Sequence, residues 1–106
     1  MLSSKTPSIA AADAAEAVPR GRLTLIDVRE PAELRSGHIK GARNIPLADL
    51  GRRMSELEGG KTVAFVCHAG ARSARATRAA QKAGVEAVNV SGGVTGWARA
   101  GLALTR

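Results

Sequence analysis

Residues 62–73 run Thr62-Val63-Ala64-Phe65-Val66-Cys67-His68-Ala69-Gly70-Ala71-Arg72-Ser73. After the threonine the first residues are all apolar, which is typical of a central strand buried on both faces of a parallel sheet. A short glycine-bearing loop follows it. The next residues, Ser73–Ala83, are rich in Ala and Arg and predict a helix that ends before Gly84. A buried strand that leads through a short loop into a helix indicates an α/β fold.

Further strands and helices alternate on both sides of this unit. Apolar runs predict two more strands, Leu23–Val28 and Ala87–Val90. Helices are predicted over Ser8–Glu16 with Ser8 as N-cap, Pro31–Ser36, Leu47–Leu57, and around Trp97. This alternation predicts a parallel sheet that is covered by helices on both faces.

The size and composition are those of one small globular domain. The chain has 106 residues, so we expect a single domain over residues 1–106. Phe65 and Trp97 are the only aromatic residues, which suits tight aliphatic layers better than an aromatic-walled barrel. One cysteine cannot form an internal disulfide. Met1–Pro7 lacks a signal-peptide pattern and Ile9–Val18 is too short to span a bilayer, so we expect a cytoplasmic protein without membrane contact.

The chain is strongly basic. Sixteen Lys and Arg residues against nine Asp and Glu residues give a formal net charge of +7. A basic surface can bind nucleic acid, but these charges are scattered and no aromatic stacking platform accompanies them. Arg72, Arg75 and Arg78 form the most suggestive cluster, because they follow Cys67 closely. We therefore expect small anionic substrates rather than nucleic acid.

Cys67 lies where chemistry is expected in a parallel α/β fold. Sites in such folds form at the carboxyl ends of strands, and the amides of a loop and a helix start can converge there on negative charge. A cysteine in that position has a lowered pKa, in the range ~3.5–7.5. The alternative is a buried core thiol, since free cysteine is often buried. Gly70 and Arg72 favour the interpretation of Cys67 as a nucleophile, because a core cysteine needs neither residue beside it.

Four segments together resemble the rhodanese family, over about Ile9 to Leu102. The loop Cys67–Arg72 resembles the family's Cys-x-x-Gly-x-Arg motif. The other segments are Asp27-Val28-Arg29, Gly37-His38-Ile39-Lys40-Gly41-Ala42-Arg43-Asn44-Ile45-Pro46, and Gly92-Gly93-Val94-Thr95-Gly96-Trp97 followed by Ala100-Gly101-Leu102. The resemblance implies a three-layer α/β/α fold with a small, mainly parallel central sheet of about five strands.

The length of the loop separates two related chemistries. The similar phosphatases and arsenate reductases have one more residue between cysteine and arginine, and the phosphatases usually have histidine where Val66 stands here. A smaller ring of amides suits a sulfane sulfur and crowds a phosphate or arsenate. A phosphatase also needs a general acid, and the loop contains no acidic residue. The resemblance therefore favours sulfur transfer.

The family's chemistry gives each loop residue an expected role. The Cys67 thiolate would take a sulfane sulfur from a donor such as thiosulfate and pass it, from a persulfide, to cyanide or a thiol. The substrate-binding residues would be His68, Ala69, Gly70, Ala71, Arg72 and Ser73, whose amides stabilise the anionic sulfur. We expect no cofactor, no metal and a monomer. The partners would be a small anionic sulfur donor and a thiol acceptor, or a protein of a sulfur relay.

Several of these residues have a structural alternative. Arg72 could bind an anionic donor, tune the cysteine or pair with an acidic neighbour, and Ser73 could donate to the sulfur or cap the helix. His68 could contact substrate or be simply exposed. Asp27, Arg29, Glu33 and His38 are expected to be scaffold, with Glu33 paired to Arg29 one helical turn away. Three functions remain: a small-molecule sulfurtransferase, a sulfur-relay module, or a binding domain without turnover.

Overall fold

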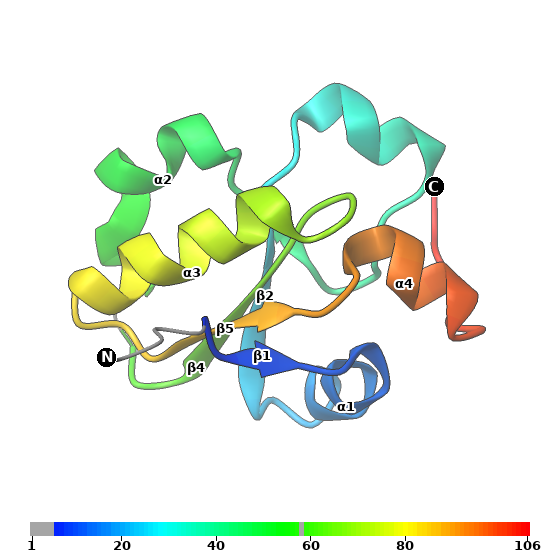
Figure 1. Ribbon diagram of the computed structural model, residues 1–106, viewed down its shortest axis with the longest axis horizontal. Coiled ribbons are helices and arrows are strands. Elements are labelled where there is room, and N and C mark those ends of the chain that lie inside the picture. The colour runs from blue at the N-terminus through cyan, green and yellow to red at the C-terminus, as the bar shows by residue number, and fades with distance from the viewer. Residues whose placement is uncertain (1–5, 58) are drawn as a thin grey trace, which may run out of the picture.

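All five strands of the central sheet run parallel, in the order β1-β5-β4-β2-β3 (Figure 1). The computed structural model describes residues 6–57 and 59–106. The strands are β1 (Ser8–Ile9), β2 (Leu23–Asp27), β3 (Arg43–Asn44), β4 (Thr62–Val66) and β5 (Ala87–Val90). The helices are α1 (Ala11–Ala17), η1 (Pro31–Ser36), α2 (Leu47–Arg53), η2 (Met54–Leu57), α3 (Ala71–Lys82) and α4 (Gly93–Arg99). This arrangement confirms the predicted α/β class and the parallel sheet.

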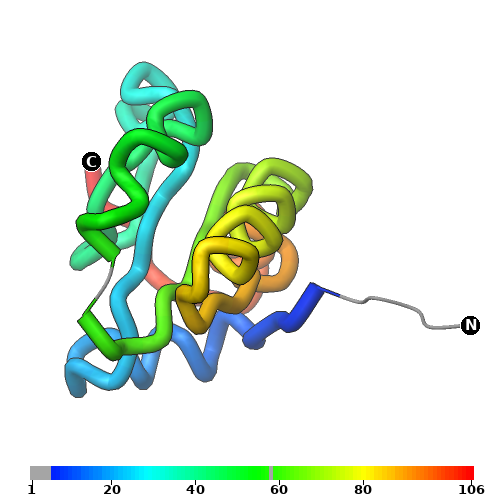
Figure 2. Tube along the Cα trace, turned by 90° about the vertical axis from the view of Figure 1, so that its left-hand side faces the viewer, coloured from blue at the N-terminus to red at the C-terminus, as the bar shows by residue number. Residues whose placement is uncertain are grey.

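The helices form one layer on each face of the sheet. On one face α2 and α3 lie side by side, as Figures 1 and 2 show, and cover a core that includes Ile26, Phe65 and Ala76. On the other face α1 and α4 contact each other over a second core that includes Leu25 and Trp97. Within residues 6–57 and 59–106, no helix has both the length and the apolar character needed to cross a membrane.

Two helix starts differ from the sequence predictions. Ser8 is not an N-cap, because Ser8 and Ile9 pair with Asn89 and Val90 of β5 as an edge strand, and α1 begins at Ala11. The helix after the cysteine begins at Ala71, two residues earlier than predicted, because Gly70 takes the N-cap position with a φ of 124°. The earlier start of α3 brings its first turn closer to Cys67 in sequence than predicted.

A buried ion pair fixes the carboxyl end of β2. Asp27 and Arg29 are 1% and 2% exposed, and their closest polar atoms are 2.8 Å apart. The Arg29 guanidinium also donates to the carbonyl oxygen of Gly37 at 3.0 Å, and the Asn44 side chain donates to the carbonyls of Asp27 and Arg29. A paired charge with its remaining donors satisfied is stable in the interior. These contacts place Asp27 and Arg29 in the scaffold, as predicted.

Candidate functional site

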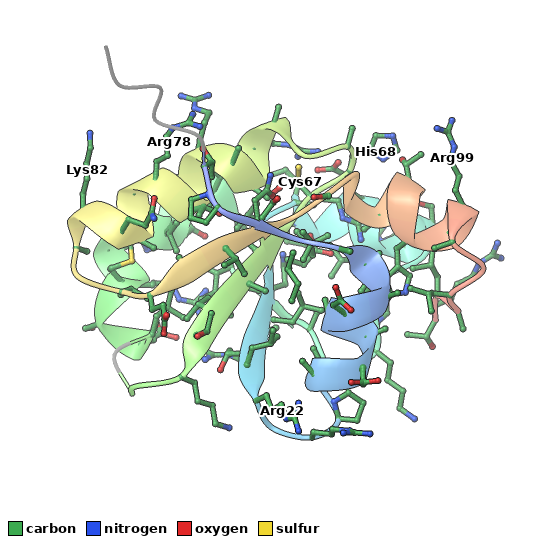
Figure 3. All side chains as sticks on the ribbon, turned by 60° about the horizontal axis from the view of Figure 1, so that its bottom comes forward. Arg22, Cys67, His68, Arg78, Lys82 and Arg99 are labelled. Atoms are coloured by element: carbon green, nitrogen blue, oxygen red, sulfur yellow. The ribbon has the colours of Figure 1, made fainter. Side chains whose placement is uncertain are left out.

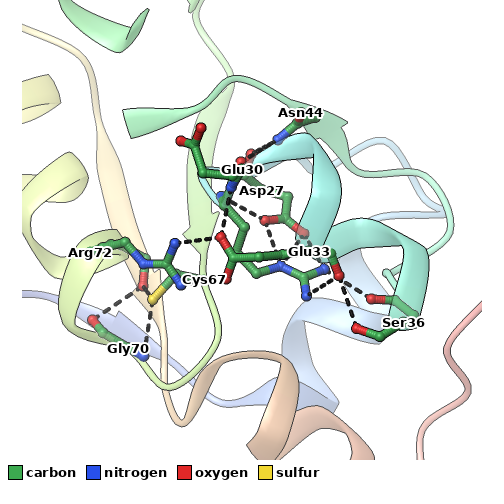
Figure 4. A network of polar contacts seen from close by, with 11 residues as sticks. Asp27, Glu30, Glu33, Ser36, Asn44, Cys67, Gly70 and Arg72 are labelled. Carbon is green, nitrogen blue, oxygen red and sulfur yellow. Dashed lines mark hydrogen bonds and ion pairs between the residues drawn. The ribbon is translucent and has the colours of Figure 1, made fainter. Parts of the chain in front are cut away.

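Cys67 follows directly on β4, the central strand, and its sulfur faces the first turn of α3 (Figure 4). The backbone N–H of Gly70 donates to Sγ at 3.1 Å, and the Ser73 hydroxyl donates to Sγ at 3.2 Å. The same hydroxyl lies 3.2 Å from the carbonyl oxygen of Gly70. Cys67 is only 2% exposed. The thiol is therefore buried, but in the turn that follows the strand and among hydrogen-bond donors.

The surroundings of Sγ favour its ionised form. Burial by itself raises the pKa of the Cys67 thiol, since it removes water from the thiolate. The hydroxyl of Ser73 and the backbone N–H groups of Ser73, Gly70 and Ala69 lower it by more, so that the pKa lies below its ordinary value. The N-terminus of the twelve-residue α3 adds a positive dipole end at this point. The loop can thus hold a negatively charged sulfur away from bulk water.

The start of α4 holds the first two loop residues in place. The N–H of Val94 donates to the carbonyl of Cys67 at 2.8 Å, and the N–H of Thr95 donates to the carbonyl of His68 at 3.1 Å. Gly93 makes this approach possible, because a Cβ there would lie 2.5 Å from the His68 carbonyl oxygen. The chain at Gly93 also has a φ of +62°, which favours glycine. A segment far along the sequence therefore positions the loop backbone.

Arg72 forms an ion pair with Glu33 across the site. Its two terminal nitrogens lie 2.7 and 2.8 Å from the Glu33 carboxylate oxygens, a bidentate geometry. The hydrogen bonds from Arg72, with a smaller contribution from the charge of Arg29, lower the pKa of Glu33 to about 2. The predicted pairing of Glu33 with Arg29 is wrong, because Arg29 is taken by Asp27 and reaches only the carbonyl of Glu33, at 3.4 Å. The pair with Arg72 ties the Cys67 loop to η1.

Asn89 is a contact of the loop that the sequence did not reveal. It stands in β5, next to β4, and its side-chain amide donates to the carbonyl of Gly70 at 3.3 Å. Its Oδ1 is buried and has no partner among the described residues. The sequence does contain a hint of this contact, since Asn89 is the one polar residue of an otherwise apolar strand. It supports the glycine whose N–H reaches the sulfur.

The other predicted residues lie at the rim of the site or outside it. His68, Ala69 and Ala71 are exposed, and His68 Nε2 lies 3.4 Å from the Thr95 hydroxyl. His38 belongs elsewhere, because its backbone pairs with Thr105 and its Nδ1 lies 3.4 Å from the carbonyl of Leu34. Across residues 6–57 and 59–106, His, Cys, Asp and Glu side chains do not gather in threes as a metal site requires.

Removing the Ser73 hydroxyl should raise the pKa of Cys67. Because a hydrogen bond to a charged group contributes ~1.5–3 kcal/mol, we expect Ser73→Ala to shift the thiol upward by about 1–2 pKa units. At neutral pH less thiolate would be present, and alkylation would follow a curve displaced to higher pH. The pH dependence of iodoacetamide alkylation measures this shift. Ser91→Ala, at an exposed serine, is the matched control. An unchanged profile in Ser73→Ala would contradict the role given to this hydroxyl.

Comparisons with known proteins identify the family of this chain. A family model described as "Rhodanese-like domain" matches residues 10–100. The uncharacterized protein YqhL of Bacillus subtilis is 47% identical over 74 residues, which cover 69% of this chain and 59% of YqhL. A protein named "Sulfurtransferase" from Allochromatium vinosum is 39% identical over 79 residues, which are 74% of each chain.

A solved structure extends the likeness to the whole fold. The rhodanese-related protein of Thermoplasma volcanium superposes with a TM-score of 0.86 at 37% identity, and the match covers 93% of this chain and 97% of that one. The chain spans less than two thirds of YqhL, so the likeness to that relative concerns a part of its length. The family model alone covers most of the chain. This chain belongs to the rhodanese-like domain family.

Proposed function

We propose that this chain is a sulfurtransferase that carries a sulfane sulfur as a persulfide on Cys67. The observation that carries the proposal is the set of donors that converge on Sγ: the Ser73 hydroxyl and the N–H groups of Ala69, Gly70 and Ser73. The same donors can stabilise a negative charge on the thiolate and on the added sulfur. The relative named "Sulfurtransferase" supports this chemistry.

The reaction proceeds in two displacement steps. The Cys67 thiolate attacks the outer sulfur of thiosulfate, an Sγ–S bond forms, and the S–S bond of thiosulfate breaks so that its electron pair leaves with sulfite. A nucleophile such as cyanide or a thiolate then attacks the terminal sulfur of the persulfide. The Sγ–S bond breaks, and its electron pair returns to Sγ as thiolate. Covalent catalysis of this kind gives ping-pong kinetics.

The carboxylates nearest the loop argue against a phosphatase. A phosphatase needs a protonated acid for the leaving alcohol. Glu33 is the carboxylate that contacts the loop, and its pKa is about 2, so it remains ionised at neutral pH. Asp27 is 1% exposed and paired with Arg29. Glu33 is thus not a proton donor, and Asp27 is buried in its ion pair away from a substrate, which favours a reaction whose leaving group needs no proton. Sulfite is such a leaving group.

Incubation with thiosulfate tests the proposal. We expect intact-protein mass spectrometry to show the addition of one sulfur atom, and subsequent cyanide to remove it with release of thiocyanate. Hydrolysis of an aryl phosphate is the parallel control and should stay at the background rate. If neither thiosulfate nor another sulfane donor leaves an adduct, the proposal is wrong and the chain is a binding domain. Aryl phosphate turnover without an adduct would identify a phosphatase instead.

A further inference from the structure

The positive charge of the chain is concentrated in the segment that bears the cysteine. Residues 59–106 contain seven Lys and Arg residues and one acidic residue, Glu86. Residues 1–58 contain nine basic and eight acidic residues. The second segment therefore carries +6 of the formal net charge of +7. It includes the Cys67 loop, α3 and α4.

Three of these cations form one stripe on α3. Arg75, Arg78 and Lys82 are exposed and lie at helical spacings of three and four. With ~100° between successive residues, the three side chains point within about 60° of one another. The buried face of the same helix consists of Ser73, Ala76, Thr77 and Ala80, which point the opposite way. The stripe is therefore a consequence of how α3 packs on the sheet.

The stripe and the end of α4 lie on either side of the cysteine loop. Figure 3 shows Lys82 and Arg78 of α3 and Arg99 of α4 pointing to the same side of the molecule, with His68 between them and Cys67 beneath. Arg99 is exposed, as are the loop residues His68 and Ala69. We call the four cations Arg75, Arg78, Lys82 and Arg99 the basic face. In this view Cys67 lies between Arg78 and Lys82 on one side and Arg99 on the other.

Acidic side chains do not neutralise the basic face among the described residues. The ion pairs of the described residues all involve other arginines. These are Arg29, Arg43, Arg52, Arg53 and Arg72, and their partners are Asp27, Asp49, Glu56 and Glu33. Arg78 instead donates to the hydroxyl of Thr6 at 3.0 Å, which leaves its charge uncompensated. Unpaired charges of one sign steer and orient a partner of the opposite sign.

We propose that the basic face docks the acidic surface of a protein whose thiol accepts the sulfur from Cys67. This inference rests on the proposed sulfurtransferase function and names its acceptor class. Charge complementarity selects an acidic partner, and the burial of Cys67, which is 2% exposed, requires that partner to be held while its thiol reaches the loop. Docking of this kind raises the effective concentration of the thiol at the persulfide.

A nucleic acid fits the same surface less well. The only aromatic residues of the chain, Phe65 and Trp97, are 0% and 4% exposed, so they cannot stack on bases. Four cations would neutralise about four phosphates, whereas tight phosphate-driven binding uses roughly 6–10 contacts. A short cationic stripe beside a reactive sulfur matches a small acidic protein surface better. The experiment below therefore also measures whether an oligonucleotide binds this surface.

The probe is a fluorescent, Glu-rich peptide with one cysteine, compared with the same peptide carrying Gln in place of each Glu. Anisotropy measures binding to the full chain, and transfer from the thiosulfate-loaded protein to the peptide thiol is measured separately. We expect the Glu peptide to bind and react at least about tenfold better at low salt. The advantage should vanish at about 0.5 M salt, where exposed charges are screened.

Charge reversal locates the docking surface. Arg75→Glu with Arg78→Glu should remove the advantage of the Glu peptide, and the milder pair Arg75→Gln with Arg78→Gln should reduce it. The matched control is Arg20→Glu with Arg22→Glu, because these exposed arginines precede β2 and Arg22 points away from Cys67 in Figure 3. The control should keep the advantage. Thermal melting of each variant shows that the fold is retained.

The outcomes separate the docking surface from the chemistry. Equal binding of the two peptides, or an equal loss in the control pair, would overturn the basic face as a docking site. Displacement of the Glu peptide by a polyuridine oligonucleotide that binds more tightly would assign the face to nucleic acid instead. Failure of thiosulfate and of other sulfane donors to load the protein would refute the proposed function, and anisotropy would still report whether the acidic peptide docks.

Discussion

Cys67→Ser will abolish the loading of sulfur from thiosulfate. Serine has the same shape as cysteine, so the hydrogen bonds from Gly70 and Ser73 can still form to its oxygen. Its hydroxyl, however, stays protonated at neutral pH and does not displace sulfite from a sulfane sulfur. We therefore expect the mass increase seen with the wild-type chain to disappear completely. Intact-protein mass spectrometry after incubation with thiosulfate measures the loss.

The single cysteine makes this result easy to interpret. The chain contains one Cys, so a covalent adduct on another thiol is impossible. The circular dichroism spectrum of Cys67→Ser should match the wild type, because the serine oxygen is only slightly smaller than the sulfur and keeps the hydrogen-bond donors of the loop. A variant that folds and still gains one sulfur atom would show that the persulfide is not formed at residue 67.

Gly93→Ala should destabilise the chain by about 3 kcal/mol or more. The added methyl group would lie 2.5 Å from the His68 carbonyl oxygen and 2.6 Å from that of Cys67, so backbone must move on one side of the contact. The φ of +62° adds a conformational cost of about 1–2 kcal/mol for a residue with a Cβ. The free energy of unfolding in urea measures the total.

Gly101→Ala is the matched control for this substitution. Gly101 follows α4, has a φ of +80° and has open space around its Cβ position. Its replacement should therefore cost only the conformational part, about 1–2 kcal/mol. We also expect Gly93→Ala to lose sulfur loading, since the displaced carbonyls belong to the loop that holds the sulfur. Equal destabilisation by the two substitutions would show that the close approach of α4 to the loop does not contribute to the free energy of unfolding.

The sequence predicted the fold where each element carries its own signal. Leu23–Asp27, Thr62–Val66 and Ala87–Val90 are mostly apolar runs, and all three are strands of the sheet. β1 and β3 were not predicted from the residues, because each has two residues and its extended shape depends on a neighbouring strand. Such short edges have no periodicity of their own. The resemblance to a family, not the pattern of residues, supplied the sheet of about five strands.

The candidate site was predictable where it is local in sequence. The cysteine, the glycine of the loop and the converging amides follow from one strand–loop–helix segment. The partners of that segment come from elsewhere: Glu33 pairs with Arg72, Asn89 supports Gly70, and the N–H of Val94 binds the Cys67 carbonyl. Propensity and spacing describe neighbours along the chain, so they do not reveal these contacts. The wrong pairing of Glu33 with Arg29 has the same cause, since Asp27 binds Arg29 and the distant Arg72 binds Glu33.

The position of β1 at the edge of the sheet has a consequence for biosynthesis. β1 is the first strand of the described residues, and it pairs with β5 at the edge of the sheet, with Ser8 opposite Asn89. β5 in turn pairs with β4, the central strand. Pairing between segments so far apart closes a long loop and slows folding. The ribosome must therefore have made the chain as far as β5 before β1 can pair with it.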